Sequence, residues 1–168
     1  MVRVEDLEKI YLMKDMPRDL LLKVASEAQL NIYSAGTVLF RINESIESFY
    51  MVLMGQVALQ VELMPELTVI LTSVNSGYAF GVSSLVSGAR ASSTAVCKET
   101  SELISLPVDQ LTMMFEEDKR LGFEFMHRLA KLFQQIMANR TGMIMRALDK
   151  HPEAMERMGD LEHLAPVL

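Results

Sequence analysis

Metal sites and nucleophilic active sites are often built from histidine, cysteine and serine. In this sequence, few of these residues have the position or the neighbours that either kind of site requires. The three histidines are His127, within a helical pattern, and His151 and His163, near the C-terminus. None lies on a segment with strand periodicity, and the serines lack both a nearby histidine and a Gly-x-Ser-x-Gly motif. The single cysteine, Cys97, excludes an intrachain disulfide, a Cys-x-x-Cys pair and a cysteine-ligated cluster. We therefore expect a protein that is not an enzyme and holds no metal.

Charge and composition narrow the class of partner. The 168 residues include 16 Lys and Arg and 22 Asp and Glu, so the net charge is −6. Affinity for nucleic acid comes largely from neutralising phosphates, so we expect no binding to nucleic acid by this chain alone. Apolar residues make up 50% of the chain, which indicates a folded domain. Polar residues interrupt the most apolar region, Phe49–Leu63, and Met1–Asp15 lacks the apolar stretch of a signal peptide, so we expect a cytoplasmic protein without a membrane partner.

The spacing of apolar residues predicts the elements that position the rest. Apolar residues at three- and four-residue steps near 7–11 and 20–28 predict two short helices. Over Leu30–Leu106 the pattern changes to short β-branched and aromatic runs, separated by turn signals about every 8 to 12 residues. Phe49–Val61, with Gly55 in its middle, predicts a hairpin. The order of helices, strands and helices predicts an α+β fold, with an antiparallel β-roll or jelly-roll barrel.

Two helices are predicted after Pro107: a short one over Val108–Phe115 and a long one over Glu116–Leu148. Apolar residues and one asparagine follow each other in the long helix at alternating steps of four and three, as in a heptad seam: Phe125, Leu129, Leu132, Ile136, Asn139 and Met143. This stripe either packs on the chain's own barrel, as we expect for its first two turns, or forms a homodimer. We predict a homodimer through Glu116–Leu148, with Asn139 fixing the register.

The chain is predicted to form one domain over 1–148, followed by a tail, Asp149–Leu168. The tail has five acidic and two basic residues, a charge that would repel DNA. It is also shorter than the about 50 residues that an independent domain needs. Its mild amphipathicity would suit docking on a downstream protein partner, although a frayed end is the commoner outcome.

Several segments, taken in order, resemble a known family. They are Ala35–Arg41, Asn43-Glu44, Phe49–Val57, Gly77–Gly81 and Arg90–Ala95. Together they resemble the cyclic nucleotide-binding domain, the fold of the catabolite activator protein and of protein kinase A regulatory subunits. A glycine usually stands at the position of Asn43 in that family, and asparagine tolerates the same left-handed backbone. The resemblance covers roughly residues 5 to 147 and implies a stand-alone, bacterial-type member without a helix-turn-helix domain.

The resemblance also implies a ligand site. In this family a short turn and helix, ending in an arginine, bind the cyclic phosphate through backbone N–H groups and the guanidinium. The matching positions in this sequence are Gly81, Val82, Ser83, Ser84, Arg90, Ser92 and Ser93. Dimeric members present a polar side chain to the purine from the long helix, roughly where Asn139, Arg140 and Thr141 stand here.

The predicted site departs from the family pattern at one position above all. Val82 replaces the glutamate that accepts a hydrogen bond from the ribose 2′-hydroxyl. An unpaired buried hydroxyl costs about 1–3 kcal/mol, or one to two decades of affinity. The linker to Arg90 is also one residue shorter than in many members and lacks the usual proline. We therefore expect a regulatory module that senses a cyclic nucleotide or another small phosphorylated ligand through an altered or degenerate site, and no further cofactor.

Other interpretations of these residues stay open at this point. Arg90 could pair with a surface carboxylate instead of a phosphate. The whole chain could be a ligand-free dimerisation or protein-interaction module that keeps the fold. A cupin-like enzyme also has a small jelly-roll barrel, but it would need histidine ligands on barrel strands, where this sequence has none.

Overall fold

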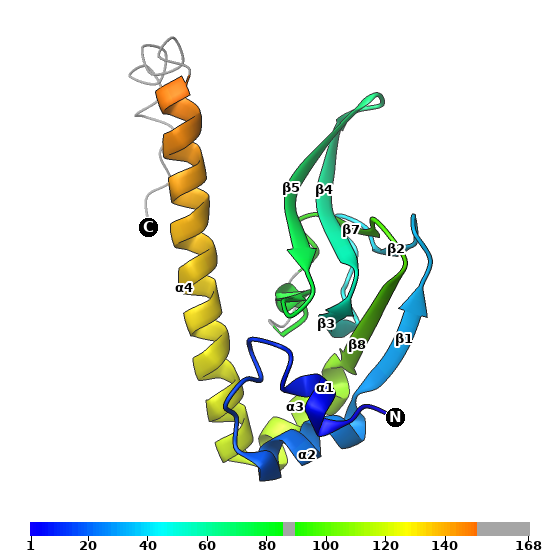
Figure 1. The fold of residues 1–168 in the computed structure, drawn as a ribbon, viewed down its shortest axis with the longest axis vertical. Helices are drawn as coiled ribbons and strands as arrows, with labels where there is room; N and C mark the ends of the chain where they lie inside the picture. Colours follow the sequence, from blue (N-terminus) through cyan, green and yellow to red (C-terminus); the bar gives the residue numbers. More distant parts are fainter. Residues whose placement is uncertain (86–89, 151–168) are drawn as a thin grey trace. The chain divides into compact units, whose positions relative to one another are not determined.

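The computed structural model describes residues 1–85 and 90–150 (Figure 1). The chain divides into two compact units, Met1–Arg128 and Leu129–Leu168, which are described separately. The first unit begins with α1 (Val4–Leu7) and α2 (Arg18–Glu27). No helix in the described ranges combines the length and the apolar character that a bilayer crossing requires.

The strands of the first unit form two antiparallel sheets of four strands each, which confirms the predicted β-roll. One sheet has the order β1-β8-β3-β6 and the other the order β2-β7-β4-β5. The strands are β1 (Gln29–Tyr33), β2 (Val38–Phe40), β3 (Ser48–Met54), β4 (Gln56–Met64), β5 (Leu67–Asn75), β6 (Ala79–Phe80), β7 (Thr94–Cys97) and β8 (Ser101–Pro107).

The hairpin predicted around Gly55 is confirmed as the turn from β3 to β4. Gly55 has a φ of +91°, a left-handed conformation that L side chains rarely adopt. The hydroxyl of Ser101 on β8 lies beneath this turn and accepts a hydrogen bond from the N–H of Gln56 at 3.3 Å. A β-carbon on Gly55 would lie 2.8 Å from the Ser101 α-carbon, so the close approach of β8 also requires glycine.

Two groups of side chains form the core of the first unit. Within the β-roll, Val52, Val57, Phe80 and Leu103 are buried in one apolar cluster. Where the helices meet the strands, the ring of Phe125 lies 5.5 Å from Phe49, edge to face, and 5.2 Å from Phe115. Such aromatic pairs stabilise the fold by more than their buried area alone would, and they hold the first turns of the long helix on the β-roll. The expectation that the helix begins on its own domain is confirmed at Phe125.

The predicted boundary of the long helix was wrong. A continuous helix from Glu116 does not form: α3 (Val108–Glu117) ends, Asp118 adopts an extended backbone, and α4 (Lys119–Lys150) begins anew. The Asp118 carboxylate accepts hydrogen bonds from the N–H groups of Arg120 and Leu121 at 3.0 and 3.1 Å, so it caps the new helix. Helical periodicity continues across this cap, and neither proline nor glycine marks it.

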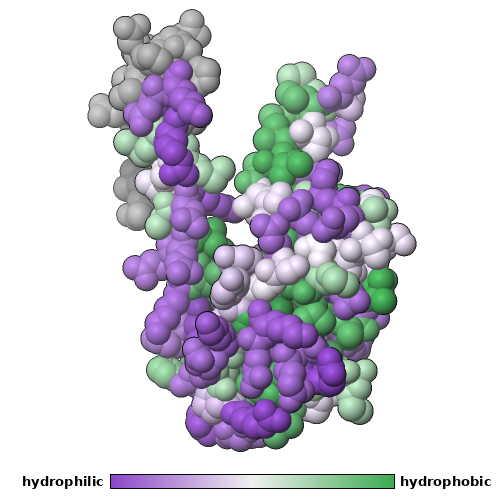
Figure 2. Space-filling model, viewed as in Figure 1, coloured by the Kyte–Doolittle hydropathy of each residue, from purple (hydrophilic) through white to green (hydrophobic). Residues whose placement is uncertain are grey.

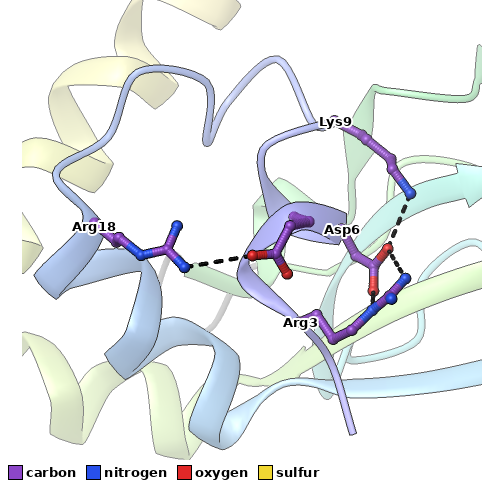
Figure 3. Close-up of polar contacts among 5 residues, drawn as sticks. Arg3, Asp6, Lys9 and Arg18 are labelled. Carbon is purple, nitrogen blue, oxygen red and sulfur yellow. Dashed lines mark hydrogen bonds and ion pairs between the residues drawn. The ribbon is translucent and has the colours of Figure 1, made fainter.

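A small group of charged side chains holds the N-terminal helix (Figure 3). Asp6 is 4% exposed, and its carboxylate accepts two hydrogen bonds from Arg3, at 3.1 and 3.2 Å, and one from Lys9 at 3.0 Å. These bonds, above all those from Arg3, lower the pKa of Asp6 from 3.8 to about 2. Nearby, the Arg18 guanidinium donates to Glu5 at 3.4 Å. Acidic and basic groups are matched here, so the cluster serves local structure.

The rest of α4 belongs to the second unit. The helix continues to Lys150, two residues beyond the predicted end at Leu148. The remaining part of the predicted tail, 151–168, lies outside the described residues, and so do His151 and His163. His127 lies on α4, as expected, with its ring stacked on Phe123 at 5.8 Å.

Candidate functional site

Gly81 redirects the chain at the start of the predicted phosphate-binding segment. Strand β6 pairs with β3, which sets Phe80 opposite Tyr50 and brings Gly81 to the end of the sheet. Gly81 is buried with a φ of +80°, and a β-carbon there would lie 3.1 Å from the Ser48 carbonyl oxygen. The chain then turns into a short 3₁₀ helix, η1 (Val82–Leu85), where the Ser84 N–H donates to the Gly81 carbonyl at 3.0 Å.

Aromatic packing fixes the position of this turn. The rings of Tyr50 and Phe80 are stacked, with their centroids 5.2 Å apart and their planes 12° apart. Phe40 lies 6.1 Å from Phe80 on the core side. Burial raises the pKa of the Tyr50 hydroxyl. The residue before Gly81 is therefore held by the core of the β-roll, so the polar segment that follows starts from a rigid base.

The side chains of η1 are half-buried. Val82 presents an apolar side chain at the position predicted to match the family's glutamate. The Ser84 hydroxyl oxygen is buried and has no hydrogen-bond partner among the described residues. A buried hydroxyl without a partner is unfavourable, so this oxygen is a ready donor or acceptor for a bound group. The segment that follows, 86–89, lies outside the described residues.

Arg90 is anchored on a turn that lies far away in the sequence. Its guanidinium donates to the Asn43 carbonyl at 2.9 Å. Two backbone hydrogen bonds of 2.8 Å join the same segments, from the Asn43 N–H to the Ala91 carbonyl and from the Ala91 N–H to the Glu44 carbonyl. Asn43 has a φ of +68°, which confirms that it takes the left-handed conformation expected from the family's glycine.

The charge of Arg90 is not neutralised within the described part of the chain. The side chain is exposed, and its hydrogen-bond partner is a neutral carbonyl. The ion pairs of the described residues include Arg3, Arg18, Arg120 and Arg128, but not Arg90. The alternative that Arg90 pairs with a surface carboxylate therefore finds no support in the described residues.

The residues after Arg90 also contact the 41–44 turn. Ser92 is exposed and Ser93 is buried, and the Thr94 hydroxyl accepts a hydrogen bond from the Ile42 N–H at 3.1 Å. Sequence analysis did not connect the 41–44 turn with Arg90. The contacting residues are 47 and 52 positions apart, a separation that no spacing rule covers. The left-handed Asn43 was the one local signal.

The residues predicted to contact a base lie in the second unit. Asn139, Arg140 and Thr141 are consecutive and exposed on α4. The Thr141 hydroxyl donates to the Met137 carbonyl at 3.0 Å, so its proton is engaged within the helix. Contact between these residues and a ligand stays a prediction.

Comparison with known proteins places this geometry in a family. The family model described as the cyclic nucleotide-binding domain matches residues 30–118, just over half of the chain. No relative is found among curated proteins. Among solved structures, a candidate cyclic nucleotide-binding protein from Geobacter metallireducens GS-15 is 25% identical, with 78% of this chain and 95% of that chain covered and a TM-score of 0.68.

Two further structures share the fold at lower identity. The catabolite activator protein of Thermus thermophilus is 22% identical, with 82% of this chain and 62% of that chain covered and a TM-score of 0.67. The regulatory domain of Toxoplasma gondii protein kinase A, solved with cyclic AMP, is 23% identical, with 66% of this chain and 42% of that chain covered and a TM-score of 0.57. The family model matches more than half of the chain, so the chain belongs to the cyclic nucleotide-binding domain family.

Proposed function

We propose that this protein is a non-enzymatic regulatory module that senses a small phosphorylated ligand at Gly81–Ser84 and Arg90–Ser93. The observation that carries this proposal is the state of Arg90. Its guanidinium is exposed, is held in place by the Asn43 carbonyl, and has no carboxylate partner among the described residues. A guanidinium held in this way can bind a phosphate by paired, charge-assisted hydrogen bonds without first breaking an ion pair.

The ligand class follows from two further residues. The Ser84 hydroxyl, buried and without a partner among the described residues, offers a hydrogen bond inside the segment. Val82 offers none, so a ribose 2′-hydroxyl at the family's usual position would stay unpaired. That loss is worth about 1–3 kcal/mol. We therefore expect the site to discriminate weakly between ribose and deoxyribose, unlike a site built around a glutamate.

A thermal-shift assay tests the proposal directly. Wild-type and Arg90→Ala protein would be heated with cyclic AMP, cyclic GMP, cyclic dinucleotides and inorganic phosphate. A ligand at 100 times its Kd adds about 2.7 kcal/mol of stability, which is several degrees in the midpoint of unfolding. We expect at least one nucleotide to stabilise the wild type and to have no effect on Arg90→Ala.

A matched arginine controls for the loss of charge. Arg120→Ala removes the same charge from the start of α4, where the side chain pairs with Asp19 at 2.8 Å. This variant should keep the ligand response. If no ligand shifts the wild type, or if Arg120→Ala loses the response as Arg90→Ala does, the site is not a phosphate sensor.

A second variant tests the altered ribose position. Val82→Glu restores the acceptor that the family uses, so it should tighten binding of a ribonucleotide by about one to two decades. The matched 2′-deoxynucleotide should gain nothing. Equal gains for both ligands would contradict a role for position 82 at the ribose.

The second candidate function is a dimerisation or protein-interaction module that works without a ligand. The observation that favours it is the apolar surface of α4, where Phe133, Met137 and Ile144 are exposed. We propose that this helix joins two copies. Sedimentation velocity of the wild type against Met137→Lys, with the exposed Gln135→Lys as control, tests this. A dimer that only Met137→Lys dissociates supports the helix interface, whereas a wild-type monomer contradicts it.

A further inference from the structure

Strand β5 is the last strand of its sheet and has no second neighbour strand among the described residues. Together with β4 it forms a hairpin that projects beyond the other strands of the first unit (Figure 1). We call the outer part of this hairpin, Val61–Thr72, the arm. An end strand carries backbone N–H and C=O groups that point away from the sheet, so it can pair with another chain.

The arm exposes apolar side chains on both of its strands. The exposed fractions run from 36% for Val69 to 62% for Leu63 and Met64, and Leu67, Ile70 and Leu71 lie between them. Figure 2 shows this hydrophobic colouring along one side of the projecting hairpin, with hydrophilic residues at its tip. Large apolar patches on an exposed element mark an interaction surface.

The other end strands of the two sheets are shorter. Strands β2 (Val38–Phe40) and β6 (Ala79–Phe80) have only 3 and 2 residues, and short end strands pair poorly with other chains. Strand β1 (Gln29–Tyr33) has 5 residues and exposes Leu30 and Ile32. Strand β5 has 9 residues and contains neither a charged residue nor a proline. Natural proteins block end strands with lysine, proline or a bulge. Only bulges occur here: the β4–β5 register shifts twice, with Leu71 as the extra residue on β5 and Leu63 as the extra residue on β4.

We propose that the arm is a docking surface for a second copy of this chain, with the two β5 strands antiparallel. The register shift at Leu71 confines the regular free edge to Leu67–Ile70. A twofold axis at Thr68, perpendicular to the sheet, then sets Thr68 opposite its own counterpart and brings Leu67 of each copy opposite Val69 of the other. Such an isologous contact needs the same surface to fit itself, and an uncharged apolar edge does so without like-charge repulsion.

Charge at the tip decides the direction of the two strands. Glu62 and Glu66 are the acidic residues of the arm, and both are exposed. In the antiparallel arrangement the two Glu66 residues lie four residue steps apart along the strands, about 14 Å. This separation exceeds the Debye length of about 8 Å at physiological salt, so their repulsion is largely screened. A parallel arrangement would set them side by side. The same carboxylates disfavour nucleic acid as the occupant.

The size of the arm sets the strength of the contact. A standard stable interface uses about 20–30 residues from each partner, and the arm from Val61 to Thr72 is much smaller. The contact therefore belongs to the weak, transient class and should be populated at high protein concentration. It lies within the first unit.

Cysteine cross-linking tests both the contact and its direction. The native Cys97 is buried with a raised pKa, so it should not react in the folded protein. A cysteine at Thr68→Cys would lie directly opposite its own counterpart, with the two α-carbons about 5 Å apart, within the reach of a disulfide. Glu66→Cys, two residues away on the same arm, would be too far from its counterpart. With diamide as oxidant, we expect dimers from Thr68→Cys and not from Glu66→Cys.

Charged substitutions then test the specificity of the surface. Adding Val69→Lys to Thr68→Cys should reduce the yield of cross-linked dimer at least tenfold, while both variants stay folded because the side chain is exposed. The control is Ile32→Lys, on the end strand β1 of the other sheet, where Ile32 is 69% exposed. Equal cross-linking at positions 66 and 68, cross-linking at 66 alone, no cross-link at 68, or an equal effect of Ile32→Lys would each overturn the proposal.

Discussion

Two antiparallel strand pairs of this protein are similarly rich in apolar residues but differ completely in burial. In the β3–β8 pair, Phe49, Met51, Val52, Leu103, Ile104 and Leu106 are all 0% exposed. In the arm of the β4–β5 pair, the exposed fractions rise to 62%. The difference lies in what covers each pair, because β3 and β8 are inner strands of their sheet and β5 is an end strand.

The comparison shows that apolar composition predicts a strand without predicting burial. The β3–β8 pair is covered on two sides, by the cluster around Val52 and Leu103 within the β-roll and by Phe125 of α4 against Phe49. Beyond the β-roll, the arm has no comparable cover from its own unit. An apolar pair that is covered stabilises the fold, and one that is not covered is available to a partner.

The largest effect is expected in the covered pair. Phe49→Ala should lower the free energy of unfolding by about 3–5 kcal/mol, because it opens a cavity between β3 and the start of α4. Chemical denaturation would measure this value. The matched control is Leu63→Ala in the arm, which should change stability by less than about 0.5 kcal/mol. Similar losses for the two variants would remove the distinction between the pairs.

The close approach of β8 to the β3–β4 turn provides the next test. Gly55→Ala should lower the free energy of unfolding by about 2–5 kcal/mol. The alanine would be strained in the left-handed conformation, and its β-carbon would clash with the Ser101 α-carbon, 2.8 Å away. Gly36→Ala should cost only about 1–2 kcal/mol, since a β-carbon at this left-handed glycine meets nothing within 4 Å. Thermal unfolding of both variants would separate the clash from the backbone strain. Equal costs would mean that β8 does not constrain the turn.

A smaller effect is expected from the ion pairs of α1. The folded-state pKa of Asp6, about 2, lies below its ordinary value of 3.8, so its contribution to stability is present above about pH 4 and is lost as the pH falls towards 2. Asp6→Asn should remove this acid dependence and lower the free energy of unfolding by about 1 kcal/mol at neutral pH. The loss is small because Arg3 and Lys9 are largely exposed. Urea denaturation from pH 2 to pH 7 would show a flatter profile for the variant. An unchanged slope between pH 4 and pH 2 would assign the acid dependence to other carboxylates.

The smallest effect on stability is expected in the arm. Val69→Lys should change the free energy of unfolding by less than about 0.5 kcal/mol, because Val69 is 36% exposed on an end strand and the lysine ammonium can reach water. The same substitution at Val52, which is 0% exposed, would bury an unpaired charge and prevent folding. Urea denaturation of the Val69 variant and soluble expression of the Val52 variant would check both. A strongly destabilised Val69→Lys would show that the arm is covered in solution.

The fold was predictable to the extent that its signals are local. The hairpin at Gly55, the left-handed Asn43 and the strand runs each depend on a few consecutive residues, and the structure confirms them. The break between α3 and α4 was predicted after Phe115 but lies at Asp118, because the apolar periodicity continues across it and does not mark its position. Its cap is visible only through hydrogen bonds to Arg120 and Leu121.

The sequence by itself determined the family, the order of the elements and the residue types of the candidate site. Local conformational preferences and side-chain chemistry are written into consecutive residues, so a single chain is enough to predict them. The tertiary structure alone decided that Arg90 is held by Asn43, 47 residues away, and that β5 ends its sheet. Both depend on which distant surfaces meet. That outcome is fixed by packing and hydrogen bonding of the whole first unit, so it is not encoded in any short segment.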